Sequence, residues 1–388
     1  MKRFLQPFFL MLAFFVLIAC KKKSSGVIPP PGGGVPVIVP PVILDTNEIR
    51  GVWITTAASN VLDSRASIRQ AVQICKASHI NHIFMVTYNN GRTIYPSPIM
   101  NALIGKPIAE RFDGRDPLRE IIEESHAVGI KVHAWFEYGF SSSFSANGGL
   151  IVAAKPNWAA KDVNGNLVVK NGFDWLNAFD PEVQNFMISL FKEVVERYNI
   201  DGVQGDDRLP AVPSTAGYDP YTVAMYKSEH GGANPPVNAF NNSWVTWRAK
   251  KLNQFLKRLR TEVKTMKPNI MFSMSPSVYP FSLTEYLQDW PTWVDSGYVD
   301  VVIPQCYRYD IAAYNATLTS QKNLHRNPAV KFYPGVLLKV GPNLASDAYL
   351  TQMLQANRAA GYKGEVFFFY EGIKDKQNYF IGQYPTIK

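Results

Sequence analysis

Cysteine and histidine, the residue types that most often bind transition metals, are scarce in this chain. It has three cysteines and six histidines among 388 residues, and no Cys-x-x-Cys or His-x-x-x-His spacing occurs. Zinc sites use such closely spaced ligands. We therefore expect no metal site and no cofactor. Cys75 and Cys306, far apart in the chain, are expected to be buried thiols.

Two further absences narrow the class of protein. No Gly-x-Gly-x-x-Gly motif follows the first predicted strand, where a dinucleotide-binding fold places its phosphate loop. No arginine-rich run occurs, and Lys2, Arg3 and residues 21–23 contribute five of the positive charges behind the formal net charge of +9. The rest of the chain is only mildly basic, so a nucleic-acid partner is not indicated.

Residues 1–19 have the features of a secretory signal peptide. Lys2 and Arg3 precede an apolar stretch too short to span a bilayer comfortably, and Leu17-Ile18-Ala19 comes directly before Cys20. This ending resembles the bacterial lipobox, in which the cysteine becomes the lipid-bearing first residue. We expect Cys20 to anchor an exported protein to the bacterial cell envelope, at the outer membrane. Signal cleavage nearby, with Cys20 unmodified, is the alternative.

Residues 20–45 are predicted to form a lipid-anchored tether. They contain Pro29-Pro30-Pro31, Gly32-Gly33-Gly34 and Pro40-Pro41, a composition that cannot build a hydrophobic core. Residues 46–388 contain no second break of this kind. Their length of about 340 residues suits one α/β barrel domain.

From Arg50 onward, short apolar runs alternate with amphipathic stretches, which is the pattern of repeated βα units. The predicted strands are residues 51–56, 82–89, 131–138, 201–207, 270–277, 299–307, 331–339 and 364–371. The predicted helices include residues 116–128, 181–198, 244–266 and 348–360. The pattern predicts an α/β fold, a TIM-type (β/α)8 barrel; a doubly wound open sheet is the alternative. Long loops follow the third and fourth strands, where barrel enzymes build their sites.

Side chains alternate along a strand, so each predicted strand has one side that faces the helices and one that faces the barrel axis. The predicted inward residues are largely polar or aromatic. They are Trp53, Thr55, Thr87, Asn89, His133, Trp135, Glu137, Gln204, Asp206, Ser273, Ser275, Gln305, Tyr307 and Glu371. This predicts one convergent site at the barrel mouth.

Three carboxylates, those of Glu137, Asp206 and Glu371, end inward-facing series. Glycoside hydrolysis needs an acid that protonates the leaving oxygen and a carboxylate that attacks the anomeric carbon or activates water. Asp207 falls on the opposite side by alternation, although a strand end can roll over. Each of these acids can instead form an ion pair, with Arg208 or with a loop lysine.

Aromatic and polar side chains complete the predicted site. Aromatic rings can stack on sugar faces, and amides can bond sugar hydroxyls. The candidate substrate-binding residues are Trp53, Asn89, Trp135, Trp175, Asn177, Gln204, Arg208, Gln305 and Tyr307. This mixture suits a neutral, polyhydroxylated ligand.

Several ordered blocks resemble the glycosyl-hydrolase-like family ten. The resemblance runs from about Glu48 to Ile373. Its blocks are Arg50-Gly51-Val52-Trp53, Tyr95-Pro96-Ser97, His133-Ala134-Trp135-Phe136, Leu176-Asn177 before Pro181-Glu182-Val183, Tyr198-Asn199-Ile200-Asp201-Gly202-Val203-Gln204-Gly205-Asp206-Asp207, and Val299-Asp300 to Pro304-Gln305-Cys306-Tyr307. The resemblance implies an exported, often lipid-anchored glycosidase with a TIM barrel. It also implies a carbohydrate substrate, which in some members is bacterial cell-wall glycan.

The fourth strand also resembles that of amylase-like barrels, whose nucleophile is the last Asp of Asp-Gly-x-x-x-Asp; this implies Asp206. A chitinase-like motif is not matched, because Gln204 replaces its middle acid and Arg208 stands where its acid-donating Glu belongs. The chain also departs from the family pattern. Glu137 stands where an amide is more usual, and Asn90 where an acid is expected.

The sequence thus predicts a glycoside hydrolase acting on a polysaccharide or on peptidoglycan glycan. Asp206 is the expected nucleophile or electrostatic stabiliser, and Glu371, Glu137 or Asp207 the general acid. The alternatives are a non-catalytic carbohydrate-binding lipoprotein on the same barrel and an envelope scaffold protein. The sugar, the linkage, retention or inversion, and the oligomeric state stay open.

Overall fold

The computed structural model describes residues 47–387. The predicted signal peptide, Cys20 and the tether lie outside the described residues. No helix within the described range is both long and apolar enough to cross a bilayer. The two cysteines in this range, Cys75 and Cys306, are buried and free, which confirms the expectation for them.

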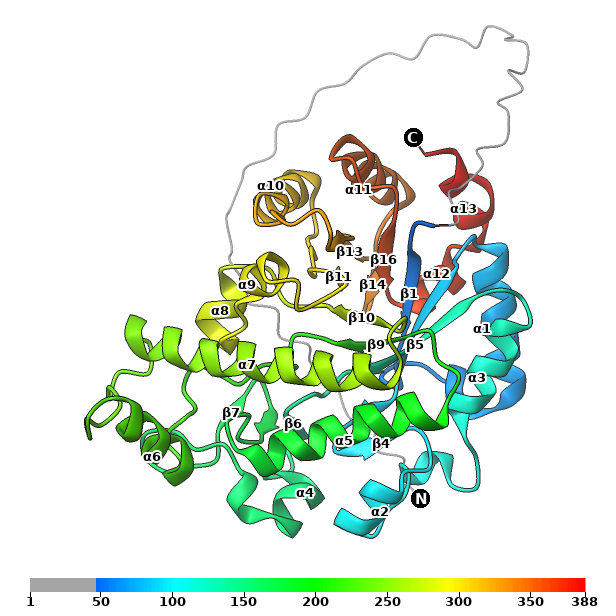
Figure 1. Cartoon of the computed structure of the whole chain (residues 1–388). Helices are drawn as coiled ribbons and strands as arrows, with labels where there is room; N and C mark the ends of the chain where they lie inside the picture. The colour runs from blue at the N-terminus through cyan, green and yellow to red at the C-terminus, as the bar shows by residue number, and fades with distance from the viewer. Residues whose placement is uncertain (1–46, 388) are drawn as a thin grey trace, which may run out of the picture.

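A nine-stranded parallel sheet forms the centre of a mixed α/β fold (Figure 1). Its order is β12-β11-β10-β9-β5-β2-β1-β16-β13. The strands are β1 (Arg50–Ile54), β2 (His82–Val86), β5 (Lys131–Phe136), β9 (Gly202–Gly205), β10 (Met271–Met274), β11 (Val301–Val302), β12 (Lys331–Phe332), β13 (Gly335–Leu337) and β16 (Glu365–Phe368). Each overlaps one of the eight predicted strands, with β1 beginning one residue before the first of them, and β12 and β13 share the seventh.

The two edge strands of this sheet, β12 and β13, follow one another in the chain. Tyr333, between β12 and β13, donates its backbone N–H to the carbonyl of Val302 at 3.1 Å, and Pro334 accepts from the N–H of Val366 at 3.1 Å. The interrupted strand therefore bonds to β11 on one side and to β16 on the other. This curled sheet is consistent with a TIM-like barrel.

Helices α1, α3, α5, α7, α10 and α11 surround the sheet (Figure 1). The α-helices are α1 (Arg65–Ala77), α2 (Pro98–Ile104), α3 (Pro117–His126), α4 (Gly149–Ala154), α5 (Pro181–Arg197), α6 (Pro220–Glu229), α7 (Asn242–Met266), α8 (Phe281–Tyr286), α9 (Trp290–Asp295), α10 (Ile311–Lys322), α11 (Asp347–Ala359), α12 (Tyr370–Asp375) and α13 (Gln377–Gly382). Four 3-10 turns are η1 (Val61–Asp63), η2 (Glu110–Phe112), η3 (Pro156–Trp158) and η4 (Tyr384–Thr386).

Helix α5 shows how the sequence fixes a helix against the sheet. Asp180 caps its first turn by accepting from the Glu182 N–H at 2.7 Å, and Pro181 occupies the first helical position. Phe191, on its buried side, stacks on Phe136 of β5 with ring centroids 3.7 Å apart. This packing fixes the end of β5, directly before Glu137.

The interior of the barrel contains a buried pair of histidines. In register, Phe84 of β2 pairs with Trp53 of β1 and with His133 of β5, and His133 pairs with Gly202 of β9. A Cβ atom at Gly202 would lie 2.1 Å from Nδ1 of His133, so only glycine fits there. His82 Nδ1 lies 2.8 Å from His133 Nε2.

The second strand ends earlier than the sequence predicts. Paired residues of parallel strands share a face, so the inward residues of β2 are those level with Trp53 and His133, not Thr87. Beyond Val86 the chain forms a hairpin of β3 (Tyr88–Asn89) and β4 (Arg92–Thr93). Alternation therefore does not continue from β2 to Asn89.

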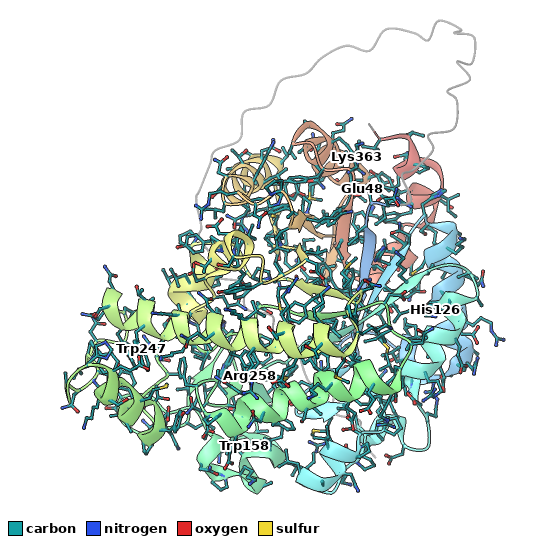
Figure 2. The ribbon with its side chains drawn as sticks, in the orientation of Figure 1. Glu48, His126, Trp158, Trp247, Arg258 and Lys363 are labelled. Carbon is teal, nitrogen blue, oxygen red and sulfur yellow. The ribbon has the colours of Figure 1, made fainter. Side chains whose placement is uncertain are left out.

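Two long connections lie at the C-terminal ends of the strands. The β5–α5 connection contains α4, η3 and the sheet of β6 (Ser141–Phe144), β8 (Phe173–Trp175) and β7 (Val169–Lys170), and the β9–α7 connection contains α6. A further hairpin pairs β14 (Lys339–Val340) with β15 (Asn343–Leu344). Glu48 and Lys363, which precede β1 and β16, lie at the opposite end of the molecule from Trp158 of the β5–α5 connection (Figure 2).

Candidate active site

Glu137 and Asp206 come at matching positions on neighbouring strands. Trp135 pairs with Gln204 in the β5–β9 register, and the residues two places later are Glu137 and Asp206. Both carboxyl groups face the mouth, because Glu137 bonds Thr55 just beyond β1 and Asp206 bonds Trp135 of β5. Glu137 is 8% exposed and Asp206 is 1% exposed. The barrel therefore holds two buried carboxyl groups at one place on its mouth.

Glu137 accepts hydrogen bonds from two other parts of the mouth. Thr55 Oγ1, just after β1, lies 3.1 Å from Oε2 and 3.3 Å from Oε1. Asn89 Nδ2, in β3, donates to Oε2 at 2.5 Å, so Asn89 reaches the mouth from the hairpin. Burial raises the pKa of Glu137, and the Arg208 charge and these bonds oppose the rise.

Asp206 accepts three N–H donors. Its Oδ1 accepts from the Arg208 backbone N–H at 2.9 Å. Its Oδ2 accepts from Trp135 Nε1 at 3.1 Å and from Arg208 Nη2 at 3.2 Å. Burial raises the pKa of Asp206 well above its ordinary value, with Arg208 opposing and Asp207 adding to the rise. Both oxygens are held in fixed positions by the protein itself.

Arg208 pairs with Asp206 and Asp207 and also bonds the main chain of Glu137. Its Nε donates to the Glu137 carbonyl at 2.7 Å, and its Nη1 lies 3.4 Å from Asp207 Oδ1. The guanidinium also lies over the rings of Phe173 and Tyr138, 4.8 and 5.5 Å from their centroids. Burial lowers the pKa of Arg208, but Asp207, Asp206 and Glu137 more than offset this and raise it. The sequence predicted substrate binding by Arg208; the structure shows it bonded to protein groups.

Asp207 pairs with Arg208 at 3.4 Å, beside Asp206, although alternation predicts that its side chain points the opposite way. Strand β9 ends at Gly205, so the alternation does not extend to Asp207. After burial, the Asp207 charge is the largest cause that raises the pKa of Tyr307 and of Tyr286. The Asp207 side chain is 24% exposed. It is the most accessible acid beside Arg208.

Below the carboxylates, polar and aromatic side chains bond to one another. Trp53 Nε1 donates to Gln204 Oε1 at 2.7 Å, and Gln204 Nε2 lies 3.2 Å from Ser273 Oγ. The Trp53 ring lies 6.4 Å from that of Trp135 and 6.3 Å from that of Phe368. These bonds fix the predicted residues Trp53, Trp135 and Gln204 in one cluster.

Gln305 and Tyr307 approach the same cluster from the other side of the barrel. Gln305 Nε2 donates to the Ser275 carbonyl at 3.1 Å. The Tyr307 ring lies 5.6 Å from Phe368, which also contacts Trp53. Alternation counted back from Glu371 puts Phe368 on the helix side, whereas the register pairs Val52 with Phe367 and so brings Phe368 level with Trp53.

The expected position of Glu371 is wrong. Strand β16 ends at Phe368, and Glu371 lies in the first turn of α12. Its Oε1 accepts from Ser59 Oγ at 2.9 Å, and its Oε2 pairs with Lys374 Nζ. Alternation from the strand cannot orient a side chain that belongs to a helix.

Two other predicted substrate residues are buried in the β5–α5 connection. Asn177 Oδ1 accepts from the Phe179 N–H at 3.1 Å, and its Nδ2 lies 3.4 Å from Thr222 Oγ1 in α6. Trp175 lies in β8, with its ring 5.8 Å from Tyr286. Its indole N–H has no partner among the described residues. Asn177 therefore joins the segment before α5 to α6, whereas Trp175 contacts Tyr286.

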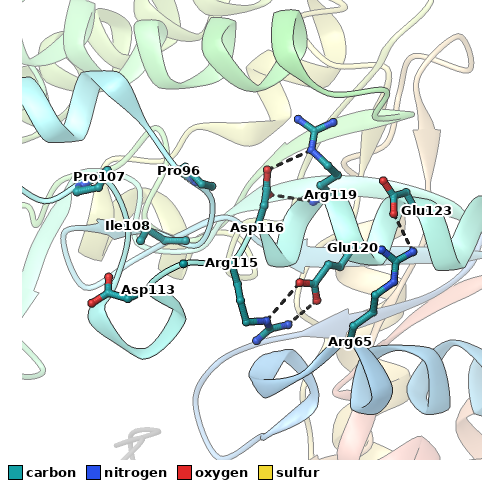
Figure 3. A pocket seen from close by; sticks show the side chains of 11 residues that line it. Arg65, Pro96, Pro107, Ile108, Asp113, Arg115, Asp116, Arg119, Glu120 and Glu123 are labelled. Carbon is teal, nitrogen blue, oxygen red and sulfur yellow. Dashed lines mark hydrogen bonds and ion pairs between the residues drawn. The ribbon is translucent and has the colours of Figure 1, made fainter.

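A groove of about 580 Å³ lies on the outer surface beside α3 (Figure 3). Most of its charged side chains pair with one another: Arg115 with Glu120, Arg119 with Asp116, and Arg65 with Glu123. None of the carboxylates around Arg208 lines it. Within residues 47–387, no three His, Cys, Asp or Glu side chains are grouped so as to hold a metal ion.

Comparison with known proteins shows the family. A model of the family described as glycosyl hydrolase-like 10 matches residues 48–348. Glycosyl hydrolase DigH of Escherichia coli (strain K12) is 28% identical over 317 residues, which cover 68% of this chain and 68% of DigH. Glycosyl hydrolase YngK of Bacillus subtilis (strain 168) is 25% identical over 328 residues, 74% of this chain and 60% of YngK.

Solved structures resemble the fold. The glycoside hydrolase domain of PgaB (BpsB) from Bordetella bronchiseptica has a TM-score of 0.63 at 13% identity, covering 85% of this chain and 96% of that domain. The catalytic domain of β-amylase from Paenibacillus polymyxa has a TM-score of 0.62 at 9% identity, covering 89% of this chain and 100% of that domain. The family match includes β5 and β9, which lead to Glu137 and Asp206, and the chain belongs to the glycosyl hydrolase-like 10 family.

Proposed function

We propose that this protein is a glycoside hydrolase that cleaves O-glycosidic bonds of a polysaccharide or cell-wall glycan. The reaction would take place at the mouth of a closed, single-domain (β/α)8 barrel. The observation that carries the proposal is the set of carboxylates around Arg208: Glu137 and Asp206 at matching positions of β5 and β9, with Asp207 beside them. The family and the glycosidase folds support this type of chemistry.

The surroundings of the acids suggest different roles. Burial raises the pKa of Glu137 and, more strongly, that of Asp206, so the pKa directions alone do not assign the protonated form that a general acid needs. Asp206 accepts three N–H donors, which stabilise a carboxylate close to a positively charged transition state. We propose Glu137 as proton donor and Asp206 as nucleophile or electrostatic stabiliser. Asp207, the more exposed acid, is the competing proton donor.

A non-catalytic carbohydrate-binding protein is the second candidate. It is favoured by one observation: Asp206 is 1% exposed and both of its oxygens already accept protein donors. A carboxylate held in this way can also be purely structural. Fold and family alone do not establish turnover.

Hydrolysis assays on the purified full-length protein separate the two candidates. The substrates are α-glucans, β-glycans and peptide-free peptidoglycan strands, with new reducing ends as the readout. Asp206→Asn and Glu137→Gln are expected to lower kcat by roughly a hundredfold to ten-thousandfold, and Asp113→Asn, an exposed acid in the outer groove, is the matched control. Binding to a glycan without hydrolysis of any substrate would favour the second candidate.

We also propose that the chain is exported and anchored to the cell envelope through Cys20. The support is the sequence Leu17-Ile18-Ala19-Cys20 after a basic and apolar leader. Labelling of cells with a fatty-acid probe, followed by membrane fractionation, tests this. The wild type is expected to carry label in the membrane fraction, and equal labelling of Cys20→Ser would refute the anchor.

A further inference from the structure

The small sheet in the β5–α5 connection presents aromatic side chains on one face. Phe173 of β8 pairs with Phe144 of β6 and with Lys170 of β7. Paired residues share a face of a sheet, and so do residues two apart on one strand. Phe144, Phe173 and Trp175 therefore lie on the same face.

This face begins at the carboxylate site. The Arg208 guanidinium lies 4.8 Å from the Phe173 ring, and Phe173 lies 5.3 Å from Tyr138 and 5.2 Å from Phe144 in edge-on contacts. The rings form a continuous series from Arg208 outward to Phe144. Phe144 is 39% exposed at the outer end.

The turn between β7 and β8 places Phe144 against the sheet. A Cβ at Gly172, whose φ is +81°, would come 2.6 Å from the Phe144 ring. The ring therefore lies directly on the turn, and glycine is required there for both space and backbone conformation. A ring held on one side and open on the other offers a flat apolar surface.

Helix α8 supplies a second series of rings. Tyr286 lies 5.8 Å from Trp175, its hydroxyl accepts from Asn171 Nδ2 at 3.0 Å, and Lys170 Nζ lies 4.7 Å from its ring centroid. Phe281, 6.0 Å from Tyr286, is 44% exposed. This series also leads from a buried ring near the mouth to an exposed one, with polar groups beside it.

We infer that these two series, Phe144 with Phe173 and Phe281 with Tyr286, form binding subsites for the continuation of a linear glycan of several sugar rings. The inference rests on the proposed function and extends it from one glycosidic bond to a polymer. Aromatic faces match the apolar faces of sugars, and polar groups lie beside them: Asn171, which bonds Tyr286, and Lys170, which pairs with Glu285. Phe173 lies against Arg208 of the proposed catalytic site, so the occupant of these faces adjoins that site, and for a glycosidase this occupant is the rest of the glycan.

The test uses the full-length protein and the variants Phe144→Ala, Phe281→Ala and the double variant. Phe240→Ala, another exposed phenylalanine on the α6–α7 connection, is the matched control. Hydrolysis rates are compared on short and long oligosaccharides, and retention is measured in gels containing α-glucan, β-glycan or peptide-free peptidoglycan strands. Phe144→Ala and Phe281→Ala are each expected to lower the preference for long over short chains by roughly two- to tenfold. Thermal unfolding confirms that the variants are folded.

The outcomes separate this inference from the proposed function. If the wild type cleaves glycan and the double variant keeps the full preference for long chains, the subsites are refuted and the glycosidase stands. If the wild type cleaves nothing but is retained in one gel, and the double variant is not retained, the subsites stand and the glycosidase fails. A wild type that neither cleaves nor is retained by any of the polymers overturns the inference.

Discussion

Protonation of the buried pair His82 and His133 is expected to destabilise the fold below neutral pH. The two rings stack with centroids 5.0 Å apart, and Phe84 stacks on His133 at 4.5 Å. Burial, with smaller contributions from Lys131 and Arg50, lowers the pKa of His82 to about 3. Burial and the neighbouring His82 lower the pKa of His133 well below its ordinary value. Both rings therefore stay neutral in the folded barrel.

The size of the effect follows from proton binding by the unfolded chain. An unfolded histidine has a pKa of about 6.5, so below this pH the unfolded chain binds a proton that folded His82 does not bind. The contribution of neutral His82 to the free energy of unfolding is fully present above that pH and is lost progressively as the pH falls toward about 3. From about pH 7.5 to about pH 5, His82 alone accounts for a loss of about 2 kcal/mol.

Urea unfolding of the wild type and of His82→Gln at the two pH values measures this contribution. Carboxylates contribute equally to the pH dependence of unfolding in both proteins. The difference between the two losses therefore isolates the contribution of the histidine. The wild type should lose about 2 kcal/mol more than the variant between the two pH values. His230→Gln, at an exposed histidine, is the control and should behave as the wild type. Equal losses in the wild type and in His82→Gln would refute the reasoning.

Three further predictions concern other parts of the barrel. Arg208→Met removes a charge that lowers the pKa of Glu137, so the profile of activity against pH should move to higher pH; an unmoved profile contradicts this. Gly202→Ala places a Cβ 2.1 Å from His133 Nδ1 and should cost about 1–3 kcal/mol or more in urea unfolding, whereas an unchanged midpoint would show that the barrel relaxes. Arg248→Met removes the guanidinium that donates to several buried backbone carbonyls, and these carbonyls then lack a donor. Proteolysis within residues 208–243 should therefore accelerate severalfold, and unchanged cleavage would argue against this role of Arg248.

Alternation along strands predicted much of the candidate site. It placed Glu137 and Asp206 on one inward face because β5 and β9 are continuous and in register up to Phe136 and Gly205. It failed for Glu371, because β16 ends at Phe368 and a helix follows. A period of two holds only while the chain stays in the sheet.

Contacts made by the inserted segments could not be predicted from local patterns. Phe173 reaches Arg208 through a small antiparallel sheet, and nothing near it in sequence indicates that pairing. Asn89 reaches Glu137 through the hairpin that follows β2. Both depend on how separate segments dock at the mouth, which is a tertiary property.

Hydrolysis in isotopically labelled water tests the central claim most directly. Full-length protein is incubated with each glycan class in water enriched in heavy oxygen, and the products are analysed by mass spectrometry. A glycosidase that uses Glu137 and Asp206 should place the heavy oxygen on the newly formed chain end, and Glu137→Gln and Asp206→Asn should each reduce the labelled product at least a hundredfold. Labelled product formed equally fast by the two variants, or none from a wild type that binds the glycan, would contradict the account.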